Sequence, residues 1–375
     1  MKRILALLLA VMMLLSVVSC GTVTNPEEGS TDEPTTNVEQ TTEAEASEPE
    51  ATTEEPTTEA PTTEEPTTEE PTTEAPTTEP EATTEPEAVE PEKFVYKHVI
   101  IVGIDGMGTY HKGADTPNMD RIFADYALTD VAETYDPVAS GPCWLSMFTG
   151  VDPKVMRVTK NPEYAPEKWY TQAVEKYPTL FELIHTQYPE TSTVASISRW
   201  TKFQELVCPQ DYIYTAGEPV HWTTAEEKNN ALAYIEQMDP DQRNFAYFYF
   251  AEPDSTGHKK EWGSAEFNNA LSECDAALGE IFDAVEAKGI LDDTLFIMVT
   301  DHGGEGTQHG YVFTDNAIKI TLGFRGKTVN NIKDFDMIFR DVAPIVTEAM
   351  GVAPSDMWAG LKNPPKVPEG LFKNE

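Results

Sequence analysis

Three aspartates and three histidines follow apolar runs of the chain, in the segments GIDGMG, AEPDSTGH and TDHGGEGTQHG: Asp105, Asp254, His258, Asp301, His302 and His309. Carboxylate oxygens and imidazole nitrogens are the ligands that Zn²⁺ and similar divalent ions accept. Ser140, in DPVASGPCW, brings the set to seven groups, more than one tetrahedral ion needs. The set therefore indicates a pair of ions, which together activate a nucleophile and stabilise the attacking and leaving oxygens of a displacement.

Each segment taken alone has an ordinary explanation. An aspartate after a strand is usually a turn or capping residue, and the Asp254–His258 pair could combine a turn with a surface histidine. GIDGMG lacks the GxGxxG spacing of a dinucleotide-binding turn, and Asp105 would repel a pyrophosphate there. A turn or capping role explains Asp301 and His302 less well, because the glycine-rich loop that contains them costs backbone entropy on folding. The metal-site hypothesis rests on all the segments meeting.

The elements that must bring these segments together alternate between strands and helices. Buried strands are predicted over 97–104, 192–198, 244–250, 294–300 and 318–324, with helical patterns between them, the longest over 264–287. This alternation predicts an α/β fold, a doubly wound and mostly parallel sheet with helices on both faces. In such sheets ligands bind beyond the carboxyl ends of the strands, where the six side chains stand.

Ser140 precedes a short helix predicted over 143–149. A bound metal ion lowers the pKa of a nearby hydroxyl, so this serine could act as a nucleophile without a histidine base. The alternative is that Ser140 caps the helix N-terminus, a role that serine often has.

With these segments the chain resembles the alkaline phosphatase superfamily, and more closely its type I phosphodiesterase/nucleotide pyrophosphatase branch. The resemblance runs from about Lys97 to about Met357, through VIIVGIDGMG, TPNMDRI, ASGPCWLSMFTG, YFAEPDSTGH, TDHGGEGTQHG and, more loosely, RDVAPIVTEAMG. It implies an alkaline-phosphatase-like domain that binds two divalent ions, expected to be Zn²⁺, and hydrolyses phosphate esters, first of all phosphodiesters. It also implies Ser140 as the nucleophile, whose oxygen faces the second ion. By position, the first ion's ligands are Asp254, His258 and His309, and the second ion's are Asp105, Asp301 and His302.

One position departs from that family's pattern. Family phosphodiesterases commonly carry an asparagine three residues after the nucleophile, where this chain has Cys143, and a thiol is a weak donor. The N–H groups at the helix start, such as that of Gly141, or the side chain of Asn161 are alternative phosphate contacts. Trp144 is a candidate wall for a leaving-group pocket, although a packed tryptophan is the ordinary reading.

Other activities remain open on the same fold. SGPCW overlaps the sulfatase pattern, but Trp144 stands in place of its arginine and GIDG lacks its paired aspartates. A phosphomonoesterase and a phosphonate hydrolase would use the same ligands. A different class is a catalytically dead surface binding protein, which the loss of a ligand would favour, yet no ligand is lost.

The N-terminus predicts export. Residues 1–20, MKRILALLLAVMMLLSVVSC, form a signal peptide whose last residue, Cys20, ends a lipobox-like VVSC, so we expect a lipid-anchored protein on the extracellular face of a membrane. The alternative is an uncleaved transmembrane anchor. Residues 21–93 are Thr/Glu/Pro-rich and predict a disordered stalk, and residues 94–375 form the catalytic domain.

The chain has a formal net charge of −39, and residues 21–92 hold 23 acidic residues and no Lys or Arg. Such acidity argues against a nucleic-acid-binding surface, since that binding relies on basic residues. A monomer is expected. Four bases could still meet an anionic substrate, or be ordinary surface charge: Arg157, Lys160, Arg199 and Lys202. Glu305 and Gln308 could face the site or the solvent.

Overall fold

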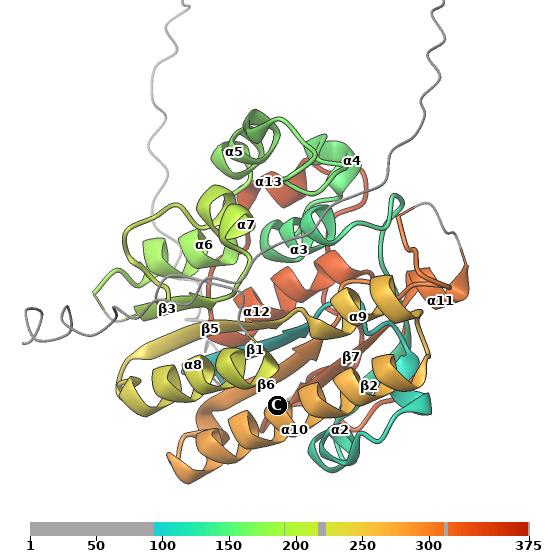
Figure 1. Cartoon of the computed structure of the whole chain (residues 1–375). Helices are drawn as coiled ribbons and strands as arrows, with labels where there is room; N and C mark the ends of the chain where they lie inside the picture. Colours follow the sequence, from blue (N-terminus) through green and yellow to red (C-terminus); the bar gives the residue numbers. More distant parts are fainter. Residues whose placement is uncertain (1–93, 191, 217–222, 311–313, 374–375) are drawn as a thin grey trace, which may run out of the picture. The chain divides into compact units, whose positions relative to one another are not determined.

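The fully buried segment HVIIVGI forms β1 (His98–Ile104), the middle strand of a seven-stranded sheet in the order β2-β7-β6-β1-β5-β3-β4 (Figure 1). The computed structural model describes residues 94–190, 192–216, 223–310 and 314–373. The predicted signal peptide, Cys20 and the linker lie outside these residues. Within the described ranges, no helix combines the length and apolar character that a membrane crossing requires.

Five neighbouring strands are parallel. β5 (Arg243–Phe250) and β6 (Thr294–Val299) flank β1, β3 (Ser192–Ile197) pairs with β5, and the short β4 (Ile213–Tyr214) pairs with β3. This arrangement confirms the predicted α/β fold with a mostly parallel sheet. β4 was not predicted, because a strand of two residues has too few positions to show an alternating pattern.

The other edge of the sheet is the antiparallel part of this mostly parallel sheet. β7 (Lys319–Arg325) is antiparallel to β6, and β2 (Ala127–Glu133), which was not predicted, is antiparallel to β7. The described residues between β6 and β7 form a loop and the one-turn helix α11 (Asp315–Ile318). A parallel strand needs a long crossover connection, whereas this link returns the chain beside β6 in the opposite direction.

Helices cover both faces of the sheet (Figure 1). Val99 and Ile101 of β1 belong to one apolar core, whereas Ile100 and Val102 belong to the other, as the two-residue period of a strand requires. The first core includes residues of α3 (Ser140–Thr149), α6 (Leu180–Gln187) and α12 (Val342–Met350). The second includes residues of α2 (Pro117–Phe123), α8 (Thr224–Gln237) and α10 (Ala265–Ala287). The helices on both faces that the sequence predicts are confirmed.

Shorter elements connect this framework. They are η1 (Tyr110–Gly113), α4 (Pro153–Met156), α5 (Glu167–Lys176), α7 (Thr201–Val207), α9 (Glu252–Lys260), η2 (Leu291–Asp293), η3 (Phe339–Asp341) and α13 (Asp356–Ala359). α9 begins two residues after β5 ends, and its Pro253 suits the first turn because its ring fixes φ near the helical value.

Strand register places the polar segments at one level of the sheet. Ile104 at the end of β1 is opposite Phe250 at the end of β5, and Gly103 is opposite Val299 at the end of β6. Asp105 continues this alignment, since its N–H donates to the carbonyl of Phe250 at 2.8 Å. The three strands therefore end together, and the side chains that follow them meet at one edge.

Candidate active site

Asp105, Asp301 and His302, which we name the Asp105 cluster, meet beyond β1 and β6. The Nε2 atom of His302 lies 3.5 Å from Asp105 Oδ1 and 3.3 Å from Asp301 Oδ2. The exposed fraction of each of the three residues is 1% or less. Their ligand atoms all lie within 4.8 Å of one another, which is close enough to hold one metal ion.

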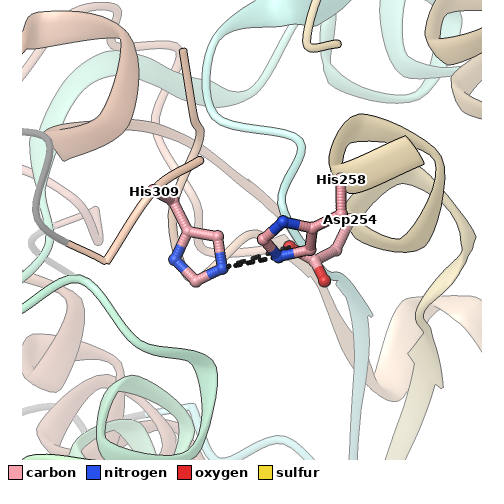
Figure 2. Close-up of side chains that lie close together, drawn as sticks. All are labelled: Asp254, His258 and His309. Carbon is pink, nitrogen blue, oxygen red and sulfur yellow. Dashed lines mark hydrogen bonds and ion pairs between the residues drawn. The ribbon is translucent and has the colours of Figure 1, made fainter. Parts of the chain in front are cut away.

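Asp254, His258 and His309 form a second group, the Asp254 cluster (Figure 2). Asp254 Oδ1 lies 3.6 Å from Nε2 of both histidines, and the two Nε2 atoms are 3.0 Å apart. Asp254 and His258 lie on α9, whereas the sequence placed them only after the end of a strand. Their four-residue spacing places both on one face of that helix.

The ring orientation of each histidine is set by a backbone carbonyl. Nδ1 lies 3.0 Å from the Thr307 oxygen in His258, 2.9 Å from the Gly303 oxygen in His302 and 2.9 Å from the Val138 oxygen in His309. A carbonyl only accepts, so each Nδ1 carries the proton and each Nε2 presents a lone pair. Two such lone pairs face each other across the Asp254 cluster, and a cation between them would satisfy both. Metal-binding histidines are commonly oriented in this way.

The electrostatics of the two clusters also fit cations. Burial, followed by the nearby charge of Asp105, raises the pKa of Asp254 and Asp301 well above the usual range. Burial lowers the pKa of His302, and lowers that of His309 to about 2, so these imidazoles supply no positive charge. Asp254 Oδ1 and Asp301 Oδ2 accept no hydrogen bond from the described residues. Buried carboxylates without donors are expensive unless a cation compensates them, so the residues present fit two divalent ions.

Glycine in the DHGG segment permits a close approach of two strand ends. A Cβ atom on Gly303 would lie 2.0 Å from the carbonyl oxygen of Asn316 and 3.1 Å from the Cα of Gly108. Gly106 adopts φ +72°, and a Cβ there would lie 2.8 Å from the Cα of Asp254. Only glycine lets the backbone pass this near to the two clusters.

Ser140 contacts the Asp105 cluster. Its Oγ lies 2.9 Å from His302 Nε2 and 3.3 Å from Asp105 Oδ1. Ser140 is the first residue of α3, and the N-cap is Ala139, whose side chain offers no oxygen. The capping alternative for Ser140 is therefore wrong. Its side chain is directed at the clustered carboxylate and imidazole instead.

Two aromatic residues donate hydrogen bonds to the carboxylate of Asp105. The Tyr249 hydroxyl donates to Asp105 Oδ2 at 2.6 Å, and Trp144 Nε1 donates to the same oxygen at 3.2 Å. Trp144 is fully buried, which does not agree with the sequence-based idea that it walls a leaving-group pocket. Tyr249 was not singled out from the sequence, and the signal available for it was a hydroxyl one residue before the strand end.

A cavity of about 600 Å³ opens onto this arrangement and is lined by residues of both clusters, by Ser140 and by Asn161. The N–H of Gly141 donates to Asn161 Oδ1 at 2.9 Å, so this N–H is already used, and the Asn161 amide is turned with Nδ2 away from it. Cys143 is buried outside the cavity lining, accepts from the Thr134 hydroxyl at 3.2 Å, and has its pKa raised to about 12 by burial. The structure thus brings Asn161 to the cavity and keeps the Cys143 thiol away.

The loop between the two clusters closes on itself. Glu305 and Gln308 pair through their backbones at 2.8 and 3.1 Å, and both are exposed. These two side chains belong to a solvated turn that separates His302 from His309.

Comparison with known proteins places this geometry in a class. Over 161 residues the chain is 28% identical to a 2,3-bisphosphoglycerate-independent phosphoglycerate mutase of Brugia malayi. The aligned region covers 40% of this chain and 29% of the mutase. Over 221 residues the chain is 21% identical to ectonucleotide pyrophosphatase/phosphodiesterase family member 7 of Mus musculus, and the aligned region covers 55% of this chain and 49% of that protein. The chain thus spans half or less of the length of these curated relatives.

Solved structures share the fold at low sequence identity. Murine ectonucleotide pyrophosphatase/phosphodiesterase 5 is 13% identical with a TM-score of 0.55, covering 68% of this chain and 96% of that one. A protein of the alkaline phosphatase superfamily from Vibrio parahaemolyticus is 19% identical with a TM-score of 0.54, covering 71% and 69%. The chain therefore shares its fold with the alkaline phosphatase superfamily. Within it, the chain belongs to the type I phosphodiesterase/nucleotide pyrophosphatase family, whose model matches residues 99–338.

Proposed function

We propose that this protein is a two-metal phosphodiesterase in which Ser140 is the nucleophile. One observation carries the proposal: Asp105 and Asp254, one residue from each three-ligand cluster, line one cavity together with Ser140, and the Ser140 hydroxyl contacts the Asp105 cluster directly. A catalytically dead binding protein has no need of this arrangement.

Each cluster would hold one divalent ion, proposed to be Zn²⁺, with two imidazoles and a carboxylate in the Asp254 cluster and two carboxylates and an imidazole in the Asp105 cluster. Two such ions, when bound, neutralise phosphate charge and lower the pKa of a hydroxyl beside them. The chain contributes the orientation. Backbone carbonyls turn the imidazoles, and Tyr249 and Trp144 fix the carboxylate of Asp105.

Ser140 and Asn161 would do the remaining work on the substrate. The Ser140 oxygen forms a bond to phosphorus while the bond to the leaving oxygen breaks, and the serine proton passes to the leaving oxygen or the solvent; the seryl phosphate that results keeps the second ester group of the substrate. Water then attacks phosphorus, the bond to the Ser140 oxygen breaks, and the serine hydroxyl and a phosphate monoester are released. Asn161 Nδ2, which has no hydrogen-bond partner among the described residues, would donate to a non-bridging oxygen of the phosphate. The Asn161 amide would thus make the phosphate contact that, in family phosphodiesterases, is made by an asparagine at the position of Cys143.

A substrate panel tests the proposal. The full chain, purified with and without added zinc, is given an aryl phosphate diester, an aryl monoester, a phosphonate and an aryl sulfate, each with and without a chelator. We expect the diester to be hydrolysed fastest and every rate to collapse with the chelator. Faster turnover of the monoester, phosphonate or sulfate would reassign the substrate class, and chelator-resistant turnover would refute the metal dependence.

We also propose that the protein is exported and attached to the outer face of a membrane through lipidated Cys20, with residues 21–93 as the spacer. The support is the basic start, the apolar run and the VVSC ending of residues 1–20. Cys20→Ala should release the protein into the medium or leave it unlipidated, as mass spectrometry of the N-terminus would show. A variant that stays membrane-bound and still carries residues 1–20 would instead support an uncleaved anchor.

A further inference from the structure

Of the four bases that the sequence offered as contacts for an anion, one lies at the site. Arg199 lines the cavity beside Ser140, whereas Arg157 lines a separate groove near α4 and α5. Lys202 pairs at the surface with Glu167, whose side chain is 64% exposed. Arg199 follows the carboxyl end of β3, so it stands at the same sheet edge as the two clusters.

The guanidinium of Arg199 is anchored on two helices. Its Nε lies 3.4 Å from Glu227 Oε1 on α8, and its Nη2 lies 3.3 Å from Glu252 Oε2 on α9. Nη2 also donates to Ser255 Oγ at 3.2 Å, one residue beyond the cluster residue Asp254. With 18% of its side chain exposed, Arg199 is held at a set position relative to the Asp254 cluster.

Glu227 is an unusual partner for a surface arginine. Its side chain is 2% exposed, and a buried carboxylate is costly even when it is paired. An exposed acid would neutralise Arg199 with less desolvation, so the burial of Glu227 is better explained by the need to orient the guanidinium. Burial raises the pKa of Glu227 to about 8, so its negative charge is incomplete near neutral pH.

The scissile phosphate already has the two clusters, Ser140 and Asn161 to hold it. Arg199 and Lys259 are further cations on the cavity lining of a strongly acidic protein. A guanidinium presents a rigid fork of donors that suits the oxygens of phosphate and carboxylate. An oriented arginine in this place therefore has a second anion as its natural ligand.

We propose that Arg199, positioned by Glu227, binds a second anionic group of the substrate, a phosphate or carboxylate beyond the scissile ester. The enzyme would thus select phosphodiesters that carry an additional charge. This inference rests on the proposed phosphodiesterase function and narrows its substrate class.

Matched esters test the inference because they share a leaving group. The full chain is assayed with ethyl 4-nitrophenyl phosphate, and with the same diester carrying a terminal phosphate or a terminal carboxylate on its ethyl arm. Release of 4-nitrophenolate is followed in all three. The wild-type protein should prefer one of the charged esters by roughly 10- to 100-fold in kcat/KM, the range typical of a hydrogen-bonded charge.

Two variants and a control locate the effect. Arg199→Gln should remove this preference while turnover of the uncharged ester stays within about threefold, and Glu227→Gln should weaken the preference by a smaller factor. Lys202→Gln removes a nearby base outside the cavity lining and should change neither ester. Circular dichroism and the zinc content of each variant confirm that the fold and the clusters are intact.

The possible outcomes distinguish a failure of the proposed second anion site from a failure of the proposed phosphodiesterase activity. If the wild type hydrolyses all three esters equally well, the phosphodiesterase stands and the second anion site is wrong. An equal loss on all esters in Arg199→Gln, or a loss of zinc, would make Arg199 a support of α9 and overturn the inference. If no ester is hydrolysed, the proposed function itself fails and the inference fails with it.

Discussion

Replacing Ser140 by alanine separates its chemical role from its structural one. The variant loses one oxygen, with contacts of 2.9 Å to His302 Nε2 and 3.3 Å to Asp105 Oδ1, and it loses no helix cap because Ala139 is the N-cap. The stability change should therefore stay within about 1 kcal/mol, the typical value of one hydrogen bond. Both three-residue clusters remain complete, so the metal content should not change.

Turnover in Ser140→Ala should fall by roughly three orders of magnitude or more, about 4 kcal/mol of barrier, because the covalent step is lost. Ser146→Ala is the matched control on the same helix. The Ser146 hydroxyl is buried and donates to the Cys143 carbonyl at 2.7 Å, so its loss should lower stability by about 1 kcal/mol and leave turnover nearly unchanged.

The assay measures initial rates on the aryl diester, zinc per chain by elemental analysis and the denaturant midpoint for all three proteins. Trapping of a phosphorylated serine at low pH in the wild type, and its absence in Ser140→Ala, supplies a second readout. Activity of Ser140→Ala within about tenfold of wild type, a barrier change of only about 1.4 kcal/mol, would refute the reasoning. Water would then have to attack phosphorus without a covalent intermediate.

Three further substitutions probe the clusters and the loops around them. His309→Ala should reduce the zinc content from about two to about one per chain and abolish turnover. His185→Ala is the control and should change neither quantity, because the His185 ring stacks on Tyr212 and belongs to neither cluster. Two zinc ions retained in His309→Ala would disprove the ligand assignment. Tyr249→Phe removes the 2.6 Å bond to Asp105 and should weaken metal binding by roughly 10- to 100-fold, as measured by competition with a chelating dye; unaltered affinity would show that Tyr249 does not support the site. Gly303→Ala should lower the free energy of unfolding by roughly 1–3 kcal/mol, because its Cβ would lie 2.0 Å from a backbone oxygen. Gly113→Ala is the control in the same denaturant titrations, since a Cβ there meets nothing within 4 Å. Equal stability of the two variants would contradict the close approach at Gly303.

Much of the site could be predicted from short segments of the sequence. The six candidate ligands lie in short segments that follow apolar runs, and their chemistry is a property of residue type. The main parallel strands were predictable for the same reason, since HVIIVGI and TLFIMV are continuous apolar runs. The sorting of the six ligands into two clusters followed from the family resemblance, and the observed groups match it.

Other features could not be predicted, because they depend on what each segment packs against. The sequence placed Asp254 and His258 only after the end of a strand, but α9 begins two residues after β5 ends, so the two residues share one helical face. The sequence predicted a mostly parallel sheet without showing which strand would be antiparallel, and β7 is antiparallel to β6. A local pattern contains no information about the length of a crossover or the strand beside which it ends.

What the sequence alone determined is the set of chemical groups: acids and imidazoles of the kinds that bind metal ions, a serine before a helix, and the strands that place them at one sheet edge. Only the tertiary structure decided which side chains serve these groups. Tyr249 and Trp144 donate to Asp105, Asn161 rather than Cys143 lines the cavity, and Arg199 and Lys259 are the bases that line it. The reason is physical: these contacts join residues far apart in the chain, and strand register and helix packing set the directions of their side chains.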